Sequence, residues 1–409
     1  MPMNSELKPK IRFKGFTDDW EQRKLGDIGN TFTGLSGKTK DDFGHGHARF
    51  VTYMNVFTNP IATMDKTELV EIDHKQNEVK YGDIFFTTSS ETPEEVGMSS
   101  VWLENKTNVY LNSFCFGFRP IEQNNPYYMA YMLRANSFRS KMILLAQGIS
   151  RYNISKNSAM NIEIQLPKSK EQESIGKLFY EIDSLITLHQ RKCDKLVELK
   201  KSLLEKMFPK NNSVIPEIRF KGFTDDWEQC KLKELCNIYD GTHQTPNYKD
   251  SGIMFLSVEN INDLKSNKYI SNIDFKNNFK IYPEKNDILM TRIGDIGTTN
   301  IVKDNTLKAY YVSLALLKCR GINPYYLNFA IKSDFVQNGL KLRSLLTAIP
   351  MKINKDQIGE VDIEYPIELK EQSNIGQIFD NLDNLITLHQ RKHDKLNKIK
   401  QSLLNDMFV

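Results

Sequence analysis

Residues 170–208 have the sequence KEQESIGKLFYEIDSLITLHQRKCDKLVELKKSLLEKMF, and residues 370–408 repeat it as KEQSNIGQIFDNLDNLITLHQRKHDKLNKIKQSLLNDMF. The two stretches are identical at 24 of 39 aligned positions, and each lacks proline and contains a single glycine. Their apolar residues recur at alternating steps of three and four, which predicts two long amphipathic helices with a coiled-coil seam. The predicted seam residues are Ile182, Leu185, His189, Leu196, Leu203, Leu382, Leu385, His389, Leu396 and Leu403.

Two such seams in one chain can bury each other. Because the segments are copies, we expect an antiparallel coiled coil with approximate twofold symmetry. Two separate surface helices are the alternative. A histidine at the same seam position of each copy would suit a metal site or a pH switch, but neither has a carboxylate or thiol partner in the pattern, which favours packed or partly exposed histidines.

A second repeat extends the duplication to the whole chain. The sequence IRFKGFTDDWEQ occupies residues 11–22 and recurs without change at residues 218–229. The period of about 200 residues is that of a domain and far exceeds that of a solenoid repeat. We therefore predict six segments: a repeated N-terminal segment (1–22), a first variable domain (23–167), a central repeated helix (168–210), a linker with the second repeated segment (211–229), a second variable domain (230–366) and a C-terminal repeated helix (367–409).

The two variable domains share an outline but few residues. Short β-like runs separated by turns, such as YGDIFFTT in the first copy and KNDILMTRIGDIG in the second, alternate with a helical stretch. This pattern predicts an α+β class, with two globular domains built on twisted, mainly antiparallel sheets.

Composition excludes several classes of protein. The chain has 409 residues, 40% of them hydrophobic, and 55 Lys and Arg against 51 Asp and Glu, so its charge neither demands nor forbids a nucleic-acid partner. The five cysteines lack CxxC spacing, which argues against a disulfide framework or a zinc site. No stretch approaches the roughly 18 apolar residues of a membrane helix, and we expect a cytoplasmic protein.

Motifs for catalysis are weak. NPYY at residues 125–128 and 323–326 is close to the NPPY of DNA amino-methyltransferases, but each copy leads into a helical run, which favours an asparagine cap followed by a first-turn proline. Acidic residues followed by ExK, at Asp194 and near Asp362, suit a solvated helix face better than a nuclease metal site. No phosphate-binding loop is present, and we predict no catalytic residue, metal or cofactor in this chain.

Two dissimilar domains between two near-identical connectors resemble the specificity subunits of type I restriction-modification systems. The segment RFKGFTDDWEQRKLGDI (residues 12–28) is similar to the entry into a target-recognition domain, and LPKSKEQESIGKLFYEID (residues 166–183) is similar to its exit. The second copy has Tyr365 where the first has a leucine before proline. The resemblance implies a non-catalytic subunit whose variable domains each recognise half of an asymmetric, bipartite site in double-stranded DNA.

The resemblance also implies the partners. Two modification subunits, which bind S-adenosylmethionine and methylate adenine, would dock on the helices and nearby repeated segments. Restriction subunits would add ATP- and Mg-dependent translocation and cleavage. A helix of about 38 residues spans roughly 57 Å, more than the 34 Å of one DNA turn, so the paired helices would fix the gap between half-sites. A two-headed protein-binding scaffold and a fused methyltransferase or nuclease are the competing hypotheses.

Loop residues at comparable places in the two copies are the candidates for DNA contact, because small polar side chains contact base edges and basic ones contact phosphates. Arg292 is a candidate for a guanine contact. The complete set is Ser36, Lys38, Thr39, Lys40, Thr88, Ser89, Ser90, Ser150, Arg151, Tyr152, Thr242, His243, Gln244, Thr245, Tyr248, Arg292, Thr347 and Lys352.

Overall fold

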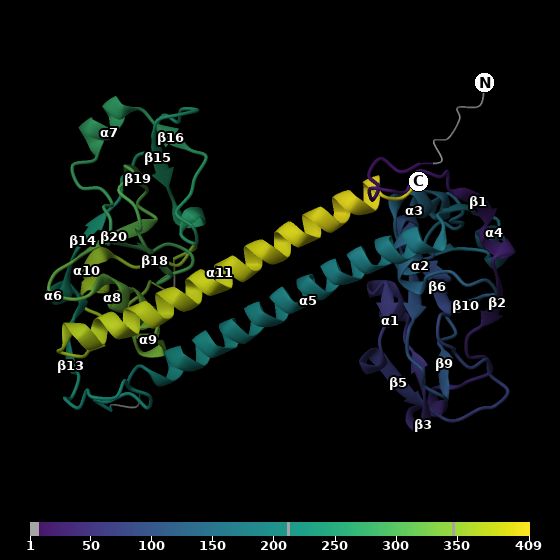
Figure 1. The fold of residues 1–409 in the computed structure, drawn as a ribbon. Coiled ribbons are helices and arrows are strands. Elements are labelled where there is room, and N and C mark those ends of the chain that lie inside the picture. The colour runs from purple at the N-terminus through teal and green to yellow at the C-terminus, as the bar shows by residue number, and fades with distance from the viewer. Residues whose placement is uncertain (1–7, 211–212, 346–347) are drawn as a thin grey trace. The chain divides into compact units, whose positions relative to one another are not determined.

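The computed structural model describes residues 8–210, 213–345 and 348–409. The chain forms two compact units, the first made of residues 1–190 and 391–409 and the second of residues 191–390. Helices α5 (Ser169–Lys206) and α11 (Leu369–Asp406) each begin in one unit and end in the other, and they are drawn in teal and yellow in Figure 1. Each unit therefore combines one variable sequence with one end of both long helices.

The first unit has a central five-stranded sheet in the order β2-β10-β6-β8-β4 and a three-stranded sheet in the order β5-β3-β9, besides the two-stranded pairs β1-β12 and β11-β7. Its strands are β1 (Glu21–Lys24), β2 (Gly29–Thr33), β3 (Phe43–Val51), β4 (Ile61–Ala62), β5 (Thr67–Val70), β6 (Ile84–Thr87), β7 (Ser89–Ser90), β8 (Ser99–Trp102), β9 (Val109–Leu111), β10 (Cys115–Pro120), β11 (Tyr152–Asn153) and β12 (Glu163–Leu166). Its short helices are α1 (Tyr53–Thr58), α2 (Pro126–Met132), α3 (Asn136–Ile143) and α4 (Lys156–Met160).

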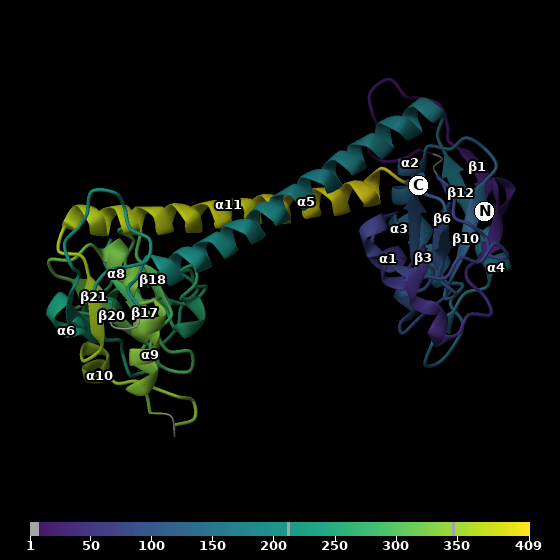
Figure 2. The same cartoon turned by 90° about the horizontal axis from the view of Figure 1, so that it is seen from below.

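The second unit repeats this plan with a four-stranded sheet in the order β14-β20-β17-β18, a three-stranded sheet β16-β15-β19 and the pair β13-β21. Its strands are β13 (Glu228–Lys231), β14 (Cys236–Asp240), β15 (Ile253–Leu256), β16 (Tyr269–Ile270), β17 (Ile288–Thr291), β18 (Thr299–Ile301), β19 (Lys308–Tyr310), β20 (Leu314–Cys319) and β21 (Asp362–Tyr365). Its short helices are α6 (Leu232–Leu235), α7 (Asn272–Asn278), α8 (Pro324–Ala330), α9 (Asp334–Leu342) and α10 (Lys355–Gly359). The predicted α+β class with small, mostly antiparallel sheets is confirmed (Figures 1 and 2).

Within each unit the ends of α5 and α11 pack against each other in opposite directions. In the first unit Lys400 pairs with Asp183 at 2.5 Å, and further along the helices the rings of Phe408 and Phe179 lie 5.4 Å apart. The second unit has the same contacts with the helices exchanged: Lys200 pairs with Asp383 at 2.5 Å, and the Phe208 and Phe379 rings lie 6.0 Å apart. Residue numbers rise along one helix as they fall along the other, so the predicted antiparallel pairing is confirmed within each unit.

The seam differs from the prediction in one respect. Ile182 and Leu382 are buried, and Leu196, Leu203, Leu396 and Leu403 are half-buried, as are His189 and His389. Leu185 and Leu385, however, are 44% and 43% exposed. In a helix with 3.6 residues per turn, the third and fourth residues after Ile182 lie about equally close to a partner helix. The structure buries the fourth more than the third: Ile186 is less exposed than Leu185, and Ile386 is less exposed than Leu385.

The twelve-residue repeat is attached to the start of the long helix in both units. Arg12 donates to both carboxylate oxygens of Glu171, at 2.6 and 2.8 Å, and Arg219 does the same to Glu371, at 2.7 and 2.9 Å. Both glutamates are 1% exposed. This pairing explains why the arginine of the repeat and the glutamate of KEQ recur together.

The NPYY segments are helix caps, as predicted. The Asn125 side chain accepts a hydrogen bond from the backbone N–H of Tyr128 at the start of α2, and the next residue is proline. Asn323 caps α8 in the same way. The backbone N–H of each asparagine donates to the glutamine of KEQ, Gln172 or Gln372. Among the helices of the described ranges, none is long and apolar enough to cross a membrane.

Glu364 on β21 provides a testable pH dependence. Partial burial raises the pKa of its carboxyl to about 7, whereas Gln165 stands at the equivalent place on β12. Between the ordinary pKa of 4.5 and 7 the folded protein binds this proton more tightly than the unfolded chain, so stability falls as pH rises through that window. We expect Glu364→Gln to remove the fall. The loss of stability is measured as the difference between the urea unfolding midpoints at pH 5 and pH 8. If Glu368→Gln, at an exposed glutamate, reduced that difference as much as Glu364→Gln does, the Glu364 carboxyl would not be its cause.

Candidate nucleic-acid interface

In the first unit four chain segments meet where strands β2 and β6 end. The backbone N–H of Leu35, just after β2, donates to the Leu111 carbonyl at 2.7 Å. Thr88, just after β6, donates from both its backbone N–H and its hydroxyl to the Phe114 carbonyl. The Ile154 N–H then donates to the Thr88 carbonyl at 3.0 Å. These bonds bring Ser36, Thr88 and the loop before β11 to the same end of the central sheet.

A pocket of about 250 Å³ lies at this meeting point and is lined by Thr33, Gly34, Leu35, Ser36, Thr88, Ser113, Cys115, Phe116 and Lys156. Only glycine fits at position 34, since a Cβ there would lie 2.0 Å from the Asn112 carbonyl oxygen. Burial raises the pKa of the Cys115 thiol to about 12, which keeps it neutral and unreactive. The pocket thus offers hydroxyls, backbone groups and one lysine as hydrogen-bonding partners.

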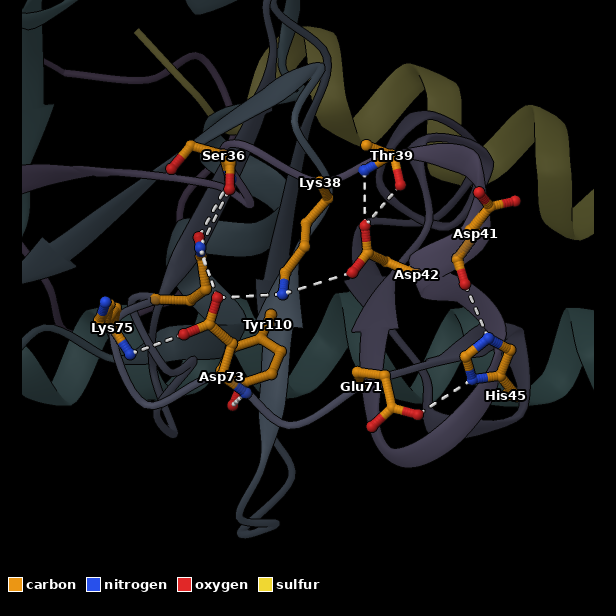
Figure 3. A network of polar contacts seen from close by, with 11 residues as sticks. Ser36, Lys38, Thr39, Asp41, Asp42, His45, Glu71, Asp73, Lys75 and Tyr110 are labelled. Carbon is orange, nitrogen blue, oxygen red and sulfur yellow. Dashed lines mark hydrogen bonds and ion pairs between the residues drawn. The ribbon is translucent and has the colours of Figure 1, made fainter.

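The loop after β2 is fastened to a second loop by the polar network in Figure 3. Lys38 pairs with Asp73 at 3.0 Å, and this bond is the main cause that lowers the pKa of Asp73 to about 2. The side-chain amide of Gln76 bonds both the N–H and the carbonyl of Ser36, each at 3.0 Å. Lys38 therefore braces the loop, while Ser36, Thr39 and Lys40 remain exposed on it.

Three more candidates lie together on a small two-stranded pair. Strand β7 pairs with β11, matching Ser90 with Tyr152 and Ser89 with Asn153. Ser90 is buried and its hydroxyl donates to the Thr92 carbonyl, so that hydroxyl already has an internal partner. In the loop before β11, Ser150 and Arg151 are exposed.

The second unit brings its candidates together through the same backbone pattern. Just after β14, the backbone N–H of Thr242 donates to the Tyr310 carbonyl. Just after β17, the backbone N–H of Arg292 donates to the Ser313 carbonyl. The Ile353 N–H donates to the Arg292 carbonyl at 3.0 Å, as Ile154 does to Thr88 in the first unit. Gly241 lies in the position of Gly34, since a Cβ there would lie 2.4 Å from Tyr311 backbone atoms.

Arg292 has internal partners in this structure. Its guanidinium forms an ion pair with Asp240, and its Nε donates to the Ile353 carbonyl at 3.1 Å. Burial lowers the pKa of Arg292. The side chain is 9% exposed, so a guanine contact, which stays a prediction, would require the Asp240 pair to open.

The remaining candidates of the second unit are spread over two loops. His243, Gln244 and Thr245 are exposed, and Thr242 is half-buried. Tyr248 is partly exposed, packs edge-on against Phe255 and lies beneath the Lys268 ammonium. Lys352 is exposed and lies beside Ile293, while Thr347 lies outside the described residues.

Two residues at the candidate interface, Lys156 and Asp240, could not be identified from the sequence pattern. Lys156 begins α4 and lines the pocket of the first unit, although it lies more than a hundred residues from Ser36. Asp240 holds Arg292 across 52 positions of sequence. Contacts of this kind come from tertiary folding, and local periodicity does not report them.

Two units of one architecture, with polar loops of different sequence at matching strand ends, define a duplicated two-domain recognition protein. The chain belongs to the type I restriction-modification DNA specificity family: the family profile described as a type I restriction modification DNA specificity domain matches residues 17–198 and 224–398. The protein is thus a type I restriction-modification specificity subunit, as the resemblance predicted.

Relatives cover nearly the whole chain. The MjaVIII specificity subunit of Methanocaldococcus jannaschii is 23% identical, over 95% of this chain and 92% of its own length. The putative MjaX specificity subunit of the same organism is 25% identical, with the same coverage. A crystal structure of the S subunit of a type I system from M. genitalium superposes with a TM-score of 0.62 at 14% identity, covering 98% of this chain and 99% of that one.

Proposed function

We propose that this chain selects the DNA sequence on which a type I restriction-modification complex acts, and that each unit recognises one half of a bipartite site in double-stranded DNA. The observation that carries the proposal is the duplicated scaffold with unlike loops. Leu35 and Thr242 occupy the same place on their sheets, as do Thr88 and Arg292, yet the residue types at these places differ. Two different loop sets on one scaffold suit the recognition of two different half-sites.

The long helices would set the distance between those half-sites. Each has 38 residues, and each begins in one unit and ends in the other. At 1.5 Å per residue such a helix spans roughly 57 Å, against about 34 Å for one turn of DNA. A length change in the helices would therefore alter the gap within the target sequence.

The exposed part of the twelve-residue repeat supports two equivalent docking sites. Lys14, Thr17 and Asp18 are exposed in the first copy, and their counterparts Lys221, Thr224 and Asp225 are exposed in the second. Internal packing does not require identical side chains at exposed positions. Two copies of one partner, the modification subunit, would require them.

The chemistry is proposed to lie in the partner subunits. The modification subunits would bind S-adenosylmethionine and methylate adenine, and restriction subunits would use ATP and Mg for translocation and cleavage. In this chain the loops would bind and position DNA.

Exchange of the variable domains tests the proposal. Replacing residues 23–167 with those of a second specificity subunit, in a cell that supplies the modification subunits, should change one half of the methylated motif and leave the other half and the gap unchanged. Genome-wide mapping of methylated adenine measures this. Exchanging residues 170–208 with 370–408, which are near-identical, is the matched control and should leave the motif unchanged. A motif that survives the domain exchange would favour the protein-binding scaffold instead.

A further inference from the structure

The most exposed large apolar side chains in the described part of the chain lie at two equivalent places, around the ends of α3 and α9 and in the loops that follow. Leu144 and Ile149 follow α3 and are 84% and 97% exposed, and Leu342 and Ile349, in α9 and the loop after it, are 85% and 100% exposed. The next most exposed, Ile273 on α7, is 72% exposed. Single exposed apolar residues are ordinary on protein surfaces, but their recurrence at one place in both copies of a duplication calls for a shared cause.

Both loops are held firmly at their bases. In the first unit Gln147 and Asn153 exchange backbone hydrogen bonds of 3.0 and 2.8 Å, and in the second the Leu345 N–H donates to the Lys352 carbonyl at 2.8 Å. Gly148 has φ +142°, and a Cβ there would lie 2.0 Å from the Arg151 carbonyl oxygen, so only glycine closes the first loop. Ile149 is thus the tip of a preformed projection.

The loops emerge beside the candidate nucleic-acid interface. Directly after each loop the backbone bonds from Ile154 to Thr88 and from Ile353 to Arg292 attach it to the strand end that carries candidate DNA contacts. The exposed side chains therefore stand at the edge of the surface proposed to meet DNA.

The charge of these regions favours a polyanion as the partner. Between α3 and α4 (residues 144–155) the chain has one basic residue, Arg151, and between α9 and α10 (residues 343–354) it has two, Arg343 and Lys352, and neither stretch contains Asp or Glu. Arg151 and Lys352 are exposed at the loop bases. DNA phosphates repel carboxylates, so a loop that meets DNA is expected to lack acidic residues, whereas a loop that binds a protein through exposed apolar side chains has no such requirement.

We propose that Ile149 and Ile349 are apolar wedges, each of which enters the groove of one half-site and partly unstacks a base step there. The inference rests on the proposed function. Apolar side chains of this kind unstack base steps in other DNA-binding proteins, and a rigid loop base lets the tip transmit force to the DNA. Arg151 and Lys352 contact the phosphates that flank the opened step. The opened step is expected to be a pyrimidine–purine step, which unstacks most easily.

Base-stacking fluorescence in the intact complex tests the wedge. The chain is purified with its modification subunits and mixed with duplexes of the methylated motif that carry 2-aminopurine at single positions away from the target adenine. Wild type should raise the fluorescence at one step in each half-site. Ile149→Ser should abolish the rise in the first half-site only and weaken binding about tenfold, as expected for the loss of one buried aliphatic side chain. Ile349→Ser should do the same in the other half-site.

Ile273→Ser and Ile149→Leu are the matched controls. The first removes an exposed isoleucine outside these loops, and the second keeps an aliphatic tip, so both should retain the fluorescence rise. Unchanged fluorescence and affinity in Ile149→Ser and Ile349→Ser, with a methylated motif that is still bipartite, would overturn the wedge and leave the proposed function intact. Loss of co-purifying modification subunit with normal base unstacking would also overturn it, and would assign the loops to protein contact. Failure of wild type to bind any motif would overturn both proposals.

Discussion

Glu171→Ala is expected to destabilise the first unit by about 3 kcal/mol, because it leaves the Arg12 guanidinium without its carboxylate in a mostly buried place. Glu171 is 1% exposed and accepts both hydrogen bonds of Arg12, at 2.6 and 2.8 Å. The Arg12 side chain is 13% exposed, so some water can reach it after the substitution, which sets the expected loss at the lower end of the range for broken buried pairs. Hydrogen exchange, followed separately for peptides of each unit, measures the local stability.

A matched pair of controls separates the ion pair from general effects. Lys177 and Glu181 lie on the same helix, 4.0 Å apart and largely exposed, so Glu181→Ala should cost at most a few tenths of a kcal/mol. Glu371→Ala, in the other copy, should produce the large loss in the second unit instead. Equal losses from Glu171→Ala and Glu181→Ala would show that the buried pair contributes nothing special.

The same pair shows why the sequence predicts the framework so well. Duplication places the arginine of the twelve-residue repeat and the glutamate of KEQ in both halves of the chain, so the repeat itself points to a shared structural role. The long helices follow from an uninterrupted apolar periodicity without proline, and the NPYY caps follow from asparagine and proline at the start of a helical run. These signals are local or duplicated, and either property can be recognised without coordinates.

The candidate interface depends on contacts that are neither local nor duplicated. Lys38 is a candidate phosphate contact because it is a basic residue on a loop, yet Asp73, 35 residues later, holds its ammonium at 3.0 Å. Arg292 has a similar internal partner in Asp240. The choice between Leu185 and Ile186 at the seam depends on a fraction of a helical turn, which the spacing of apolar residues does not resolve. Hydrophobicity would likewise bury Ile149, which the structure exposes.

Phe408→Ala is the second substitution with a large expected effect. Phe408 follows α11, yet its ring packs in the first unit, 5.6 Å from Tyr128 and 5.4 Å from Phe179. Removing a buried phenylalanine ring costs about 3–5 kcal/mol, because both transfer energy and a cavity are involved. Exchange should therefore accelerate in peptides of the first unit, including α2, although the substitution lies some 280 residues later in the chain.

Phe208→Ala is the reciprocal variant, and it tests whether the end of each long helix completes the core of the other unit. Phe208 follows α5 and packs in the second unit against Trp227 and Tyr326, so Phe208→Ala should loosen the second unit and spare the first. Phe114→Ala removes a ring that is 59% exposed in the first unit and should change stability by no more than about 0.5 kcal/mol. If Phe408→Ala loosened only residues 191–390, the assignment of the α11 end to the first unit would be wrong. If each variant loosens the unit that receives its helix end, neither unit is complete without residues from the other copy. A fragment limited to residues 23–167 would then lack part of its own core.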